Sequence, residues 1–286
     1  MISTNTQRTP AAWADLLRDA VTVPGTISQA FSRFHNYSVG NQLLALFQCK
    51  ARGIAAGPIG TFMHWKDVGR HVKKGEKALM LCMPITCKGK RSEGEQSGSN
   101  DAESAGDDFT FTRFVYRNNW FVLSQTDGAE YTPAPLPAWD ADRALQALNI
   151  QRAPFVMMDG NVQGYAQGRK VAINPVAEQP ESTLFHELAH IVLGHTAEGA
   201  VNSDSKDRTP RDIRELEAEC VALICTESLG LQGAELSRGY IQSWYRGREV
   251  PERSAQRIFH AADAILRAGR IEQVGPDQAA FAGVRP

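Results

Sequence analysis

Helical spacing of apolar residues marks the beginning of the chain. Apolar side chains recur every three or four positions over Ala12–Ala20 and again from about Ser38 to Ala51, with Pro24 and Gly25 between the two segments. This spacing gives a helix one apolar face. Two amphipathic helices are therefore predicted here, each short enough for a compact domain.

Beyond Gly60 the apolar positions change to the spacing of β-strands. Strand-like segments are Phe62–Trp65, the surroundings of Val72, the apolar run Ala78–Ile85, and the alternating aromatic stretch Phe109–Gln125. Alternation with a period of two places one side of a strand against a core. These segments predict a small antiparallel sheet.

Two polar or proline-rich segments divide the chain. Residues 88–108 are rich in Gly, Ser and acids and hold almost no apolar residue, which predicts a flexible acidic insertion in a hairpin. Tyr131–Pro137 holds three prolines in seven residues, which forbids a continuous helix or ladder. We therefore predict a domain over 1–130, a linker over 131–139 and a second domain over 140–286.

The second domain is predicted to mix helices and strands. A helix is expected near Trp139–Leu148, short strands at Phe155–Met158 and Lys170–Ile173, and several helices after them. Val171–Asn174 is expected to be an edge strand, which could pair with an extended peptide. The fold class predicted for the whole chain is α+β with two domains.

Length and composition are those of a globular protein. The chain has 286 residues, and its longest apolar run is far shorter than the roughly 18 residues of a membrane helix. Its polar beginning does not resemble a signal peptide, so a cytoplasmic protein without a membrane partner is expected. Five cysteines without a close CxxC pair predict reduced thiols.

Charge is distributed unevenly, although the net charge is only −1. Residues 1–91 carry 13 Lys and Arg against 4 Asp and Glu, whereas residues 131–286 carry 16 against 20. The basic first part is a candidate binder of polyanions. The overall balance argues against a protein that imitates DNA, because such a mimic needs a dense acidic surface.

The strongest chemical motif is His-Glu-x-x-His at His186, Glu187 and His190. Pro180 is placed to begin a helix, and a separation of four residues puts both imidazoles on one helical face, as two ligands of a tetrahedral zinc ion require. Glu187 then lies beside the open position, where it can act as general base toward the attacking water. A zinc-peptidase site is predicted, although Mn²⁺ or another divalent metal fits the same ligands.

A third protein ligand is needed, and the residues offer His195, Glu215, Glu217 and Glu219. His195 is one residue short of the metzincin spacing, which favours a histidine at the end of the helix. The segment Arg211–Ser228 is predicted to be a helix in which Glu215 and Glu219 share a face, while Glu217 points elsewhere. This pattern resembles the gluzincin peptidases, and the resemblance implies that Glu215 binds the metal and Glu219 orients a ligand histidine. Glu219 as the direct ligand is the alternative.

Cations and aromatic rings alternate in the basic first part. Phe62, His64 and Trp65 are interleaved with Lys66, Arg70, Lys73, Lys74 and Lys77. Cations can neutralise phosphates while exposed rings stack on unpaired bases, so the segment is a candidate site for single-stranded DNA. A solvated basic hairpin with its rings in the core would have the same sequence.

The order of several segments resembles the ArdC-type antirestriction proteins of conjugative plasmids. The segments are NQLLALFQCKARG, GTFMHWKDVGRHVKKGEKALMLCMPI, FVLSQTDG, TLFHELAHIVLGH and RELEAECVALI. The resemblance covers roughly Phe31 to Leu266. It implies an N-terminal domain that binds single-stranded DNA, through the region of Trp65, Lys66, Arg70, Lys73 and Lys74, and a C-terminal domain similar to zinc peptidases.

The resemblance implies that the protein protects incoming DNA from host restriction, with a restriction subunit or another DNA-bound protein as a possible peptidase substrate. Two alternatives remain. In one, the peptidase fold is an idle scaffold for DNA binding; in the other, the protein is a stand-alone regulatory metallopeptidase.

Overall fold

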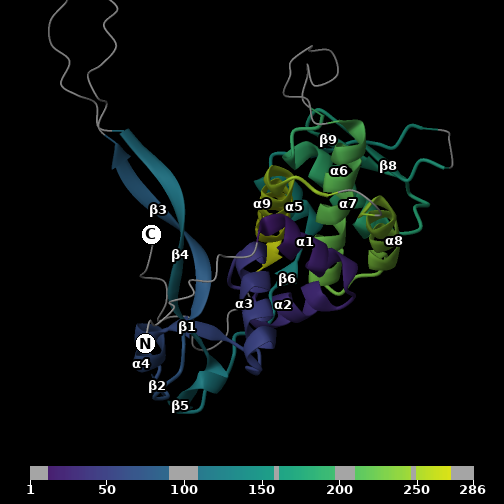
Figure 1. The fold of residues 1–286 in the computed structure, drawn as a ribbon. Helices are drawn as coiled ribbons and strands as arrows, with labels where there is room; N and C mark the ends of the chain where they lie inside the picture. The colour runs from purple at the N-terminus through teal and green to yellow at the C-terminus, as the bar shows by residue number, and fades with distance from the viewer. Residues whose placement is uncertain (1–11, 90–108, 158–160, 197–209, 246–248, 272–286) are drawn as a thin grey trace, which may run out of the picture.

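The computed structural model combines helices with small sheets, which confirms the predicted α+β class (Figure 1). It describes residues 12–89, 109–157, 161–196, 210–245 and 249–271. Among these residues, no helix is both long and apolar enough to cross a membrane. The five cysteines are free thiols, as their spacing predicts.

Three helices begin the described chain: α1 (Trp13–Thr22), α2 (Thr26–Phe34) and α3 (Val39–Arg52). The first and third are the two predicted helices. The second was not predicted, although Ile27, Phe31 and Phe34 bury one face of it. Gly25, which adopts a φ of +76°, turns the chain between α1 and α2.

A long antiparallel hairpin dominates the first sheet. Strand β3 (Leu79–Gly89) pairs along its length with β4 (Phe109–Val122), and β1 (Ile59–Thr61) pairs with the other edge of β4. A smaller ladder joins β2 (Arg70–Val72) to β5 (Thr126–Gly128), and the 3₁₀ turn Leu123–Gln125 lies between β4 and β5. The predicted antiparallel sheet is thus present. Of the predicted acidic insertion, residues 90–108 lie outside the described residues.

The prediction of a strand at Phe62–Trp65 is wrong. These residues begin helix α4 (Phe62–Asp67), because the Thr61 hydroxyl accepts a hydrogen bond from the His64 N–H at 3.2 Å and caps the first turn. The Trp65 side chain is fully buried, and its indole N–H donates to the Phe121 carbonyl at 2.9 Å. Aromatic residues favour strands in general, but local capping decided the conformation here.

The described residues of the second part of the chain combine a three-stranded sheet with five helices. The remaining elements are β6 (Ala138–Trp139), α5 (Ala141–Ala147), β7 (Gln151–Arg152), β8 (Gly164–Gln167), β9 (Lys170–Ile173), α6 (Pro180–Val192), α7 (Arg211–Ser228), α8 (Ala234–Tyr245), α9 (Glu252–Ala268) and β10 (Arg270–Ile271). Helices α5, α6 and α7 and strand β9 were predicted. The strand expected at Phe155–Met158 is absent over residues 155–157, and residue 158 lies outside the described part.

Strand β9 is not an edge strand, which corrects the prediction for Val171–Asn174. It lies in the middle of the sheet, with β7 parallel on one side and β8 antiparallel on the other. Within the described chain, β8 is the edge next to α6. The short β8 segment was not predicted, because Gly164–Gln167 lacks a run of apolar residues.

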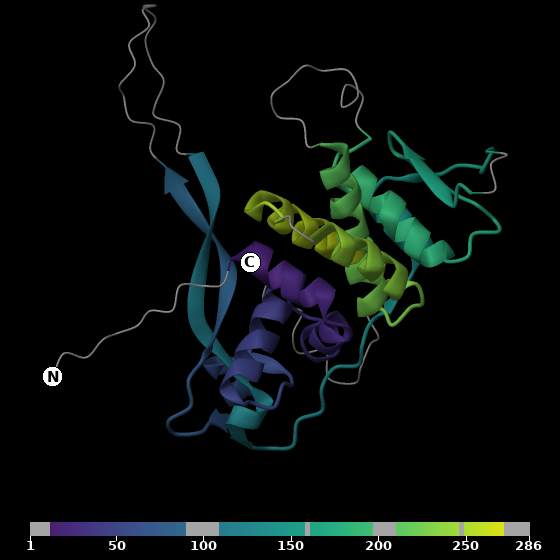
Figure 2. The same cartoon turned by 45° about the vertical axis from the view of Figure 1, so that its right-hand side comes forward.

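One hydrophobic core joins helices from both ends of the sequence. Helix α1 packs against α9, and α2 packs against α7 (Figures 1 and 2). Arg238 of α8 reinforces this packing, because it donates to the Glu227 carboxylate of α7 and to the Val21 carbonyl of α1. The boundaries predicted around 131–139 stay predictions, but helices α1–α3 share their core with the second part of the chain.

Candidate metal centre

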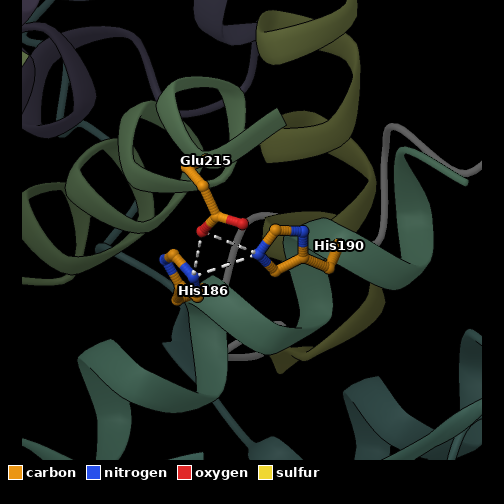
Figure 3. Close-up of side chains that lie close together, drawn as sticks. All are labelled: His186, His190 and Glu215. Atoms are coloured by element: carbon orange, nitrogen blue, oxygen red, sulfur yellow. Dashed lines mark hydrogen bonds and ion pairs between the residues drawn. The ribbon is translucent and has the colours of Figure 1, made fainter. Parts of the chain in front are cut away.

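Helix α6 presents the two histidines of the His-Glu-x-x-His motif. Pro180 occupies its first turn, where a missing N–H costs nothing, and Leu184, Phe185 and Leu188 are buried against the core. His186 and His190 are one turn apart on the remaining face. Their Nε2 atoms approach to 3.1 Å (Figure 3).

Helix α7 brings Glu215 to the same point. Its Oε2 atom lies 3.7 Å from His186 Nε2 and 3.6 Å from His190 Nε2. Ligand atoms at about 2.0–2.1 Å from a tetrahedral zinc ion are ~3.3 Å from one another, so the three separations fit one ion. Within the described residues, His186, His190 and Glu215 form the one such cluster of potential ligands.

Glu219 lies one turn further along α7 and faces the other nitrogen of His186. Its Oε1 atom is 3.3 Å from His186 Nδ1. A carboxylate at Nδ1 favours the tautomer whose Nε2 lone pair points to the metal. Glu215 thus lies near the two Nε2 atoms and Glu219 near Nδ1 of His186, while their roles as ligand and orienting residue stay predictions.

Charges in the cluster shift the pKa values of its members. Burial lowers the pKa of His186, but the carboxylates of Glu215 and Glu219 outweigh burial and raise that pKa to about 10. Hydrogen bonds with His186 and His190 hold the pKa of Glu215 well below its usual range. Without metal, a proton on His186 therefore balances the negative charge of Glu215 and Glu219. A divalent ion that binds there has to displace this proton.

Glu187 lies beside this cluster and is only 9% exposed. Burial raises the pKa of its carboxyl group above the ordinary value, while His186 and His190 partly oppose that shift. A carboxylate with a raised pKa is a better proton acceptor near neutral pH. Its environment suits the predicted role of general base.

A second chain of polar groups supports His190. Its Nδ1 atom lies 3.0 Å from Nδ1 of His195, and Nε2 of His195 lies 2.9 Å from Glu217, which is fully buried. Arg257 of α9 in turn lies 3.4 Å from the Glu217 carboxylate. If Glu217 holds the proton on His195 Nε2, then His195 Nδ1 accepts from His190, and His190 keeps its Nε2 lone pair for a metal.

His195 reaches this position because α6 ends at Val192, three residues earlier. Gly194 adopts a φ of +77°, which reverses the chain and lets the His195 N–H donate to the His190 carbonyl at 2.8 Å. His195 is thus outside the ligand cluster and at the end of the helix, as its spacing indicates. The sequence analysis did not predict that His195 connects His190 with Glu217, because Glu217 lies on another helix and meets His195 only through tertiary packing.

A pocket of about 460 Å³ opens in front of the cluster. Strand β8 forms one wall with Gly164 and Tyr165, and α7 contributes Arg211 and Arg214. Gly164 is required there, because a Cβ atom would lie 2.8 Å from the Thr183 side chain of α6. The two arginines are cations that sequence reasoning did not connect with the site.

The residues predicted to contact DNA do not form one surface. Trp65 is 0% exposed, so the prediction that it stacks on bases is wrong. The guanidinium of Arg70 is bound by the Thr126 hydroxyl at 2.8 Å and by backbone carbonyls of the β5 region. The ammonium of Lys73 donates to the Ser124 carbonyl at 3.0 Å. Lys66 and Lys74 are exposed, and their DNA contacts stay predictions.

Comparison with known proteins now adds to the geometry. Residues 13–116 match the family described as the N-terminal domain of anti-restriction factor ArdC. The fold is similar to the metal-free crystal structure of the antirestriction ArdC protein from plasmid R388, with a TM-score of 0.50, 21% identity, and coverage of 90% of this chain and 94% of that chain.

The Mn(II)-bound structure of the same plasmid protein gives a TM-score of 0.50 at 20% identity, and covers 90% of this chain and 98% of that chain. Among curated proteins, none matches the sequence. The match of residues 13–116 to the ArdC N-terminal domain and the fold shared over nine-tenths of the chain support an ArdC-type protein.

Proposed function

We propose that this protein binds single-stranded DNA and cleaves a DNA-associated protein at a gluzincin-like zinc site, and that it thereby protects incoming DNA from restriction. The convergence of His186, His190 and Glu215 beside a buried Glu187 carries the proposal. Two imidazoles and one carboxylate suit zinc. The same donors accept Mn²⁺, the ion named for the similar plasmid protein.

His186, His190 and Glu215 would hold the metal ion, which would supply Lewis acidity toward the scissile carbonyl and the attacking water. Glu187 accepts the proton of that water and delivers it to the leaving amine. Glu219 and the pair His195–Glu217 fix the tautomers of the ligand histidines through their 3.3, 3.0 and 2.9 Å contacts. His195 and Glu217 are buried, which limits competition from solvent for their contacts.

An extended peptide fits beside β8. This strand pairs with β9 on one side, and its other side lines the pocket before the cluster. Addition of a peptide strand to an exposed edge uses main-chain hydrogen bonds and is tolerant of sequence. Arg211 and Arg214 line the same pocket and place positive charge where an oxyanion or an acidic side chain would be stabilised.

Binding of DNA explains how a tolerant peptidase could select its substrates. A protein on the same DNA strand is held at a high local concentration, so that slow cleavage is directed to DNA-bound proteins. The match of residues 13–116 to the ArdC N-terminal domain is consistent with DNA binding.

Replacement of Glu187 by Gln tests the peptidase. Purified protein loaded with Zn²⁺ or Mn²⁺ is incubated with a labelled unfolded protein, with and without single-stranded DNA. We expect Glu187→Gln to lower the cleavage rate by about 10²–10⁴-fold, because the general base is lost, while metal stoichiometry and DNA binding are retained. Glu181→Gln, an exposed acid in the first turn of α6, is the matched control.

Absence of cleavage by the unmodified protein under all four conditions would contradict the peptidase and favour the idle scaffold. Cleavage without any binding of single-stranded DNA at low salt would favour the stand-alone metallopeptidase.

A further inference from the structure

Helix α9 carries a basic face that points away from the core. Arg253, Arg257, His260 and Arg267 share one side of the helix, while Ile258, Ala262 and Ile265 on the other side are buried. The guanidinium groups of Arg253 and Arg267 are on exposed residues at the two ends of this face. At 1.5 Å per residue the two positions are about 21 Å apart along the helix.

This face forms one wall of a groove of about 1000 Å³, which we call the α9 groove. The opposite wall is the β3–β4 hairpin, which contributes Cys82, Met83, Pro84 and Phe114. In Figure 2 the hairpin stands apart from α9, and α1 reaches toward it. Pro84 and Phe114 are paired across the two strands, and Phe114 is 66% exposed.

Aromatic rings line the base of the α9 groove. Trp13 stacks on Tyr116 of the hairpin at 6.4 Å between ring centroids and contacts Phe259 of α9 at 5.8 Å. Gly40 allows this arrangement, because a Cβ atom there would lie 2.6 Å from the Trp13 ring. Tyr37 and Asn41 complete the base. One wall of the groove is thus cationic, and the other wall and the base offer flat apolar surface.

Two acids near the basic face, Glu252 and Asp263, accept hydrogen bonds from backbone N–H groups at the beginnings of other helices. Both carboxylate oxygens of Glu252 accept hydrogen bonds at 2.9 Å from the N–H groups of Trp13 and Ala14 at the beginning of α1. The carboxylate of Asp263 accepts from the Val39 N–H at the beginning of α3, at 2.8 Å. Considering only the described residues, neither Arg253 nor Arg267 forms an ion pair, so their charges remain available to a ligand.

We propose that the α9 groove holds a single strand of nucleic acid, with phosphates along Arg253 and Arg267 and bases against Phe114. This inference rests on the DNA binding proposed above and gives it a site different from the basic segment 62–77. Cations along one side and exposed rings along the other are what an unpaired strand requires, whereas an acidic peptide has no bases to stack.

The α9 groove also reaches the end of the helix that carries the metal ligands. Val192 at the end of α6 and the next residue, Leu193, line it. Arg257 donates to the Leu193 carbonyl at 2.6 Å, and its other terminal guanidinium nitrogen faces Glu217. A strand bound there lies against the rear of the metal centre, on the side away from β8. A protein on that strand is held close to the peptidase pocket.

The experiment measures binding of the full chain to a labelled oligothymidylate about 20 nucleotides long, longer than the ~4–16 nucleotides of one such site, by anisotropy across a salt series. The variant Arg253→Ala with Arg267→Ala removes two exposed charges. We expect at least tenfold weaker binding and a slope of log K against log salt that is smaller by about 1.4, at about 0.7 per phosphate contact. Lys66→Ala with Lys74→Ala removes two exposed cations from segment 62–77, the competing site, and is expected to weaken binding less than twofold.

A second pair of variants tests stacking without a change in charge. Phe114→Ala is expected to weaken binding at least ~5-fold, because loss of one stacked base has about that effect or more. Phe62→Ala removes a ring that is 51% exposed in the basic segment and is expected to change nothing. Both are surface positions, and an unchanged thermal midpoint shows that each variant is folded.

Three outcomes overturn the α9 groove as the site. In the first, the unmodified chain binds and only the Lys66 and Lys74 variant loses binding. The binding site would then be segment 62–77, and the proposed DNA binding would still hold. Competition by polyglutamate as strong as that by oligothymidylate would show a general polyanion site. Failure of the unmodified chain to bind at low salt would refute DNA binding itself.

Discussion

The candidate metal centre and the basic segment 62–77 were both predicted from the sequence. In the structure, the predicted residues come together only in the candidate metal centre. His186, His190 and Glu215 converge so that their ligand atoms lie within 4.8 Å of one another. In the basic segment, Trp65 is in the core and Arg70 is bound by backbone carbonyls. Spacing on a helix fixes which side chains meet, whereas an alternation of cations and rings does not say which of them face solvent.

The largest expected effect concerns Trp65, because a core residue and a stacking residue fail in different ways. Trp65→Ala removes a fully buried indole and its hydrogen bond to Phe121, so we expect the free energy of unfolding to fall by about 3–5 kcal/mol. Urea unfolding measures this change.

Phe62→Ala at the neighbouring exposed position is the control and is expected to change stability little. If Trp65→Phe kept full stability but lost binding of single-stranded DNA, the ring would act on the ligand, and the contrast between the two regions would disappear.

The two acids of α7 provide the next test. Glu215 faces both Nε2 atoms, so Glu215→Gln is expected to weaken Zn²⁺ or Mn²⁺ binding by more than ~100-fold; Glu219→Gln affects only the orientation of His186 and is expected to cost about 10–100-fold. Metal titration by calorimetry distinguishes them. The reverse order of effects would make Glu219 the direct ligand.

The smallest effect is expected at Asp263, which lies beneath the basic face. Burial raises the pKa of its carboxyl group from 3.8 to about 6, so its contribution to stability is present below pH 3.8 and is lost as pH rises through 6. Asparagine cannot ionise, so Asp263→Asn abolishes this pH-dependent loss of stability. As pH rises from 4 to 7, we expect the free energy of unfolding of the variant to gain about 2 kcal/mol relative to that of the unmodified protein.

Thermal unfolding across this pH range measures the gain. The same substitution removes an acid from the α9 groove, so a modest increase in affinity for single-stranded DNA is expected as well. A variant less stable than the unmodified protein at pH 7 would show that the ionised carboxylate stabilises the beginning of α3.

Elements with a strong local pattern could be predicted. The bounds of α7 and the beginning of α6 at Pro180 agree with the sequence, because apolar periodicity, a proline and a run of good helix formers coincide there. Helix α4 could not be distinguished from a strand by its aromatic residues, and β8 has no apolar pattern. Short elements depend on capping and on neighbours, which no local window contains.

The sequence by itself determined that two candidate metal ligands meet, since a helical repeat places His186 and His190 together wherever the helix lies. It also determined the α+β class. Only tertiary structure decided that Glu217 and Arg257 stand behind His195, and that Arg253 and Arg267 face Phe114 across a groove. These groups come from distant segments, and their contacts exist because helices from both ends of the chain bury their apolar faces in one core.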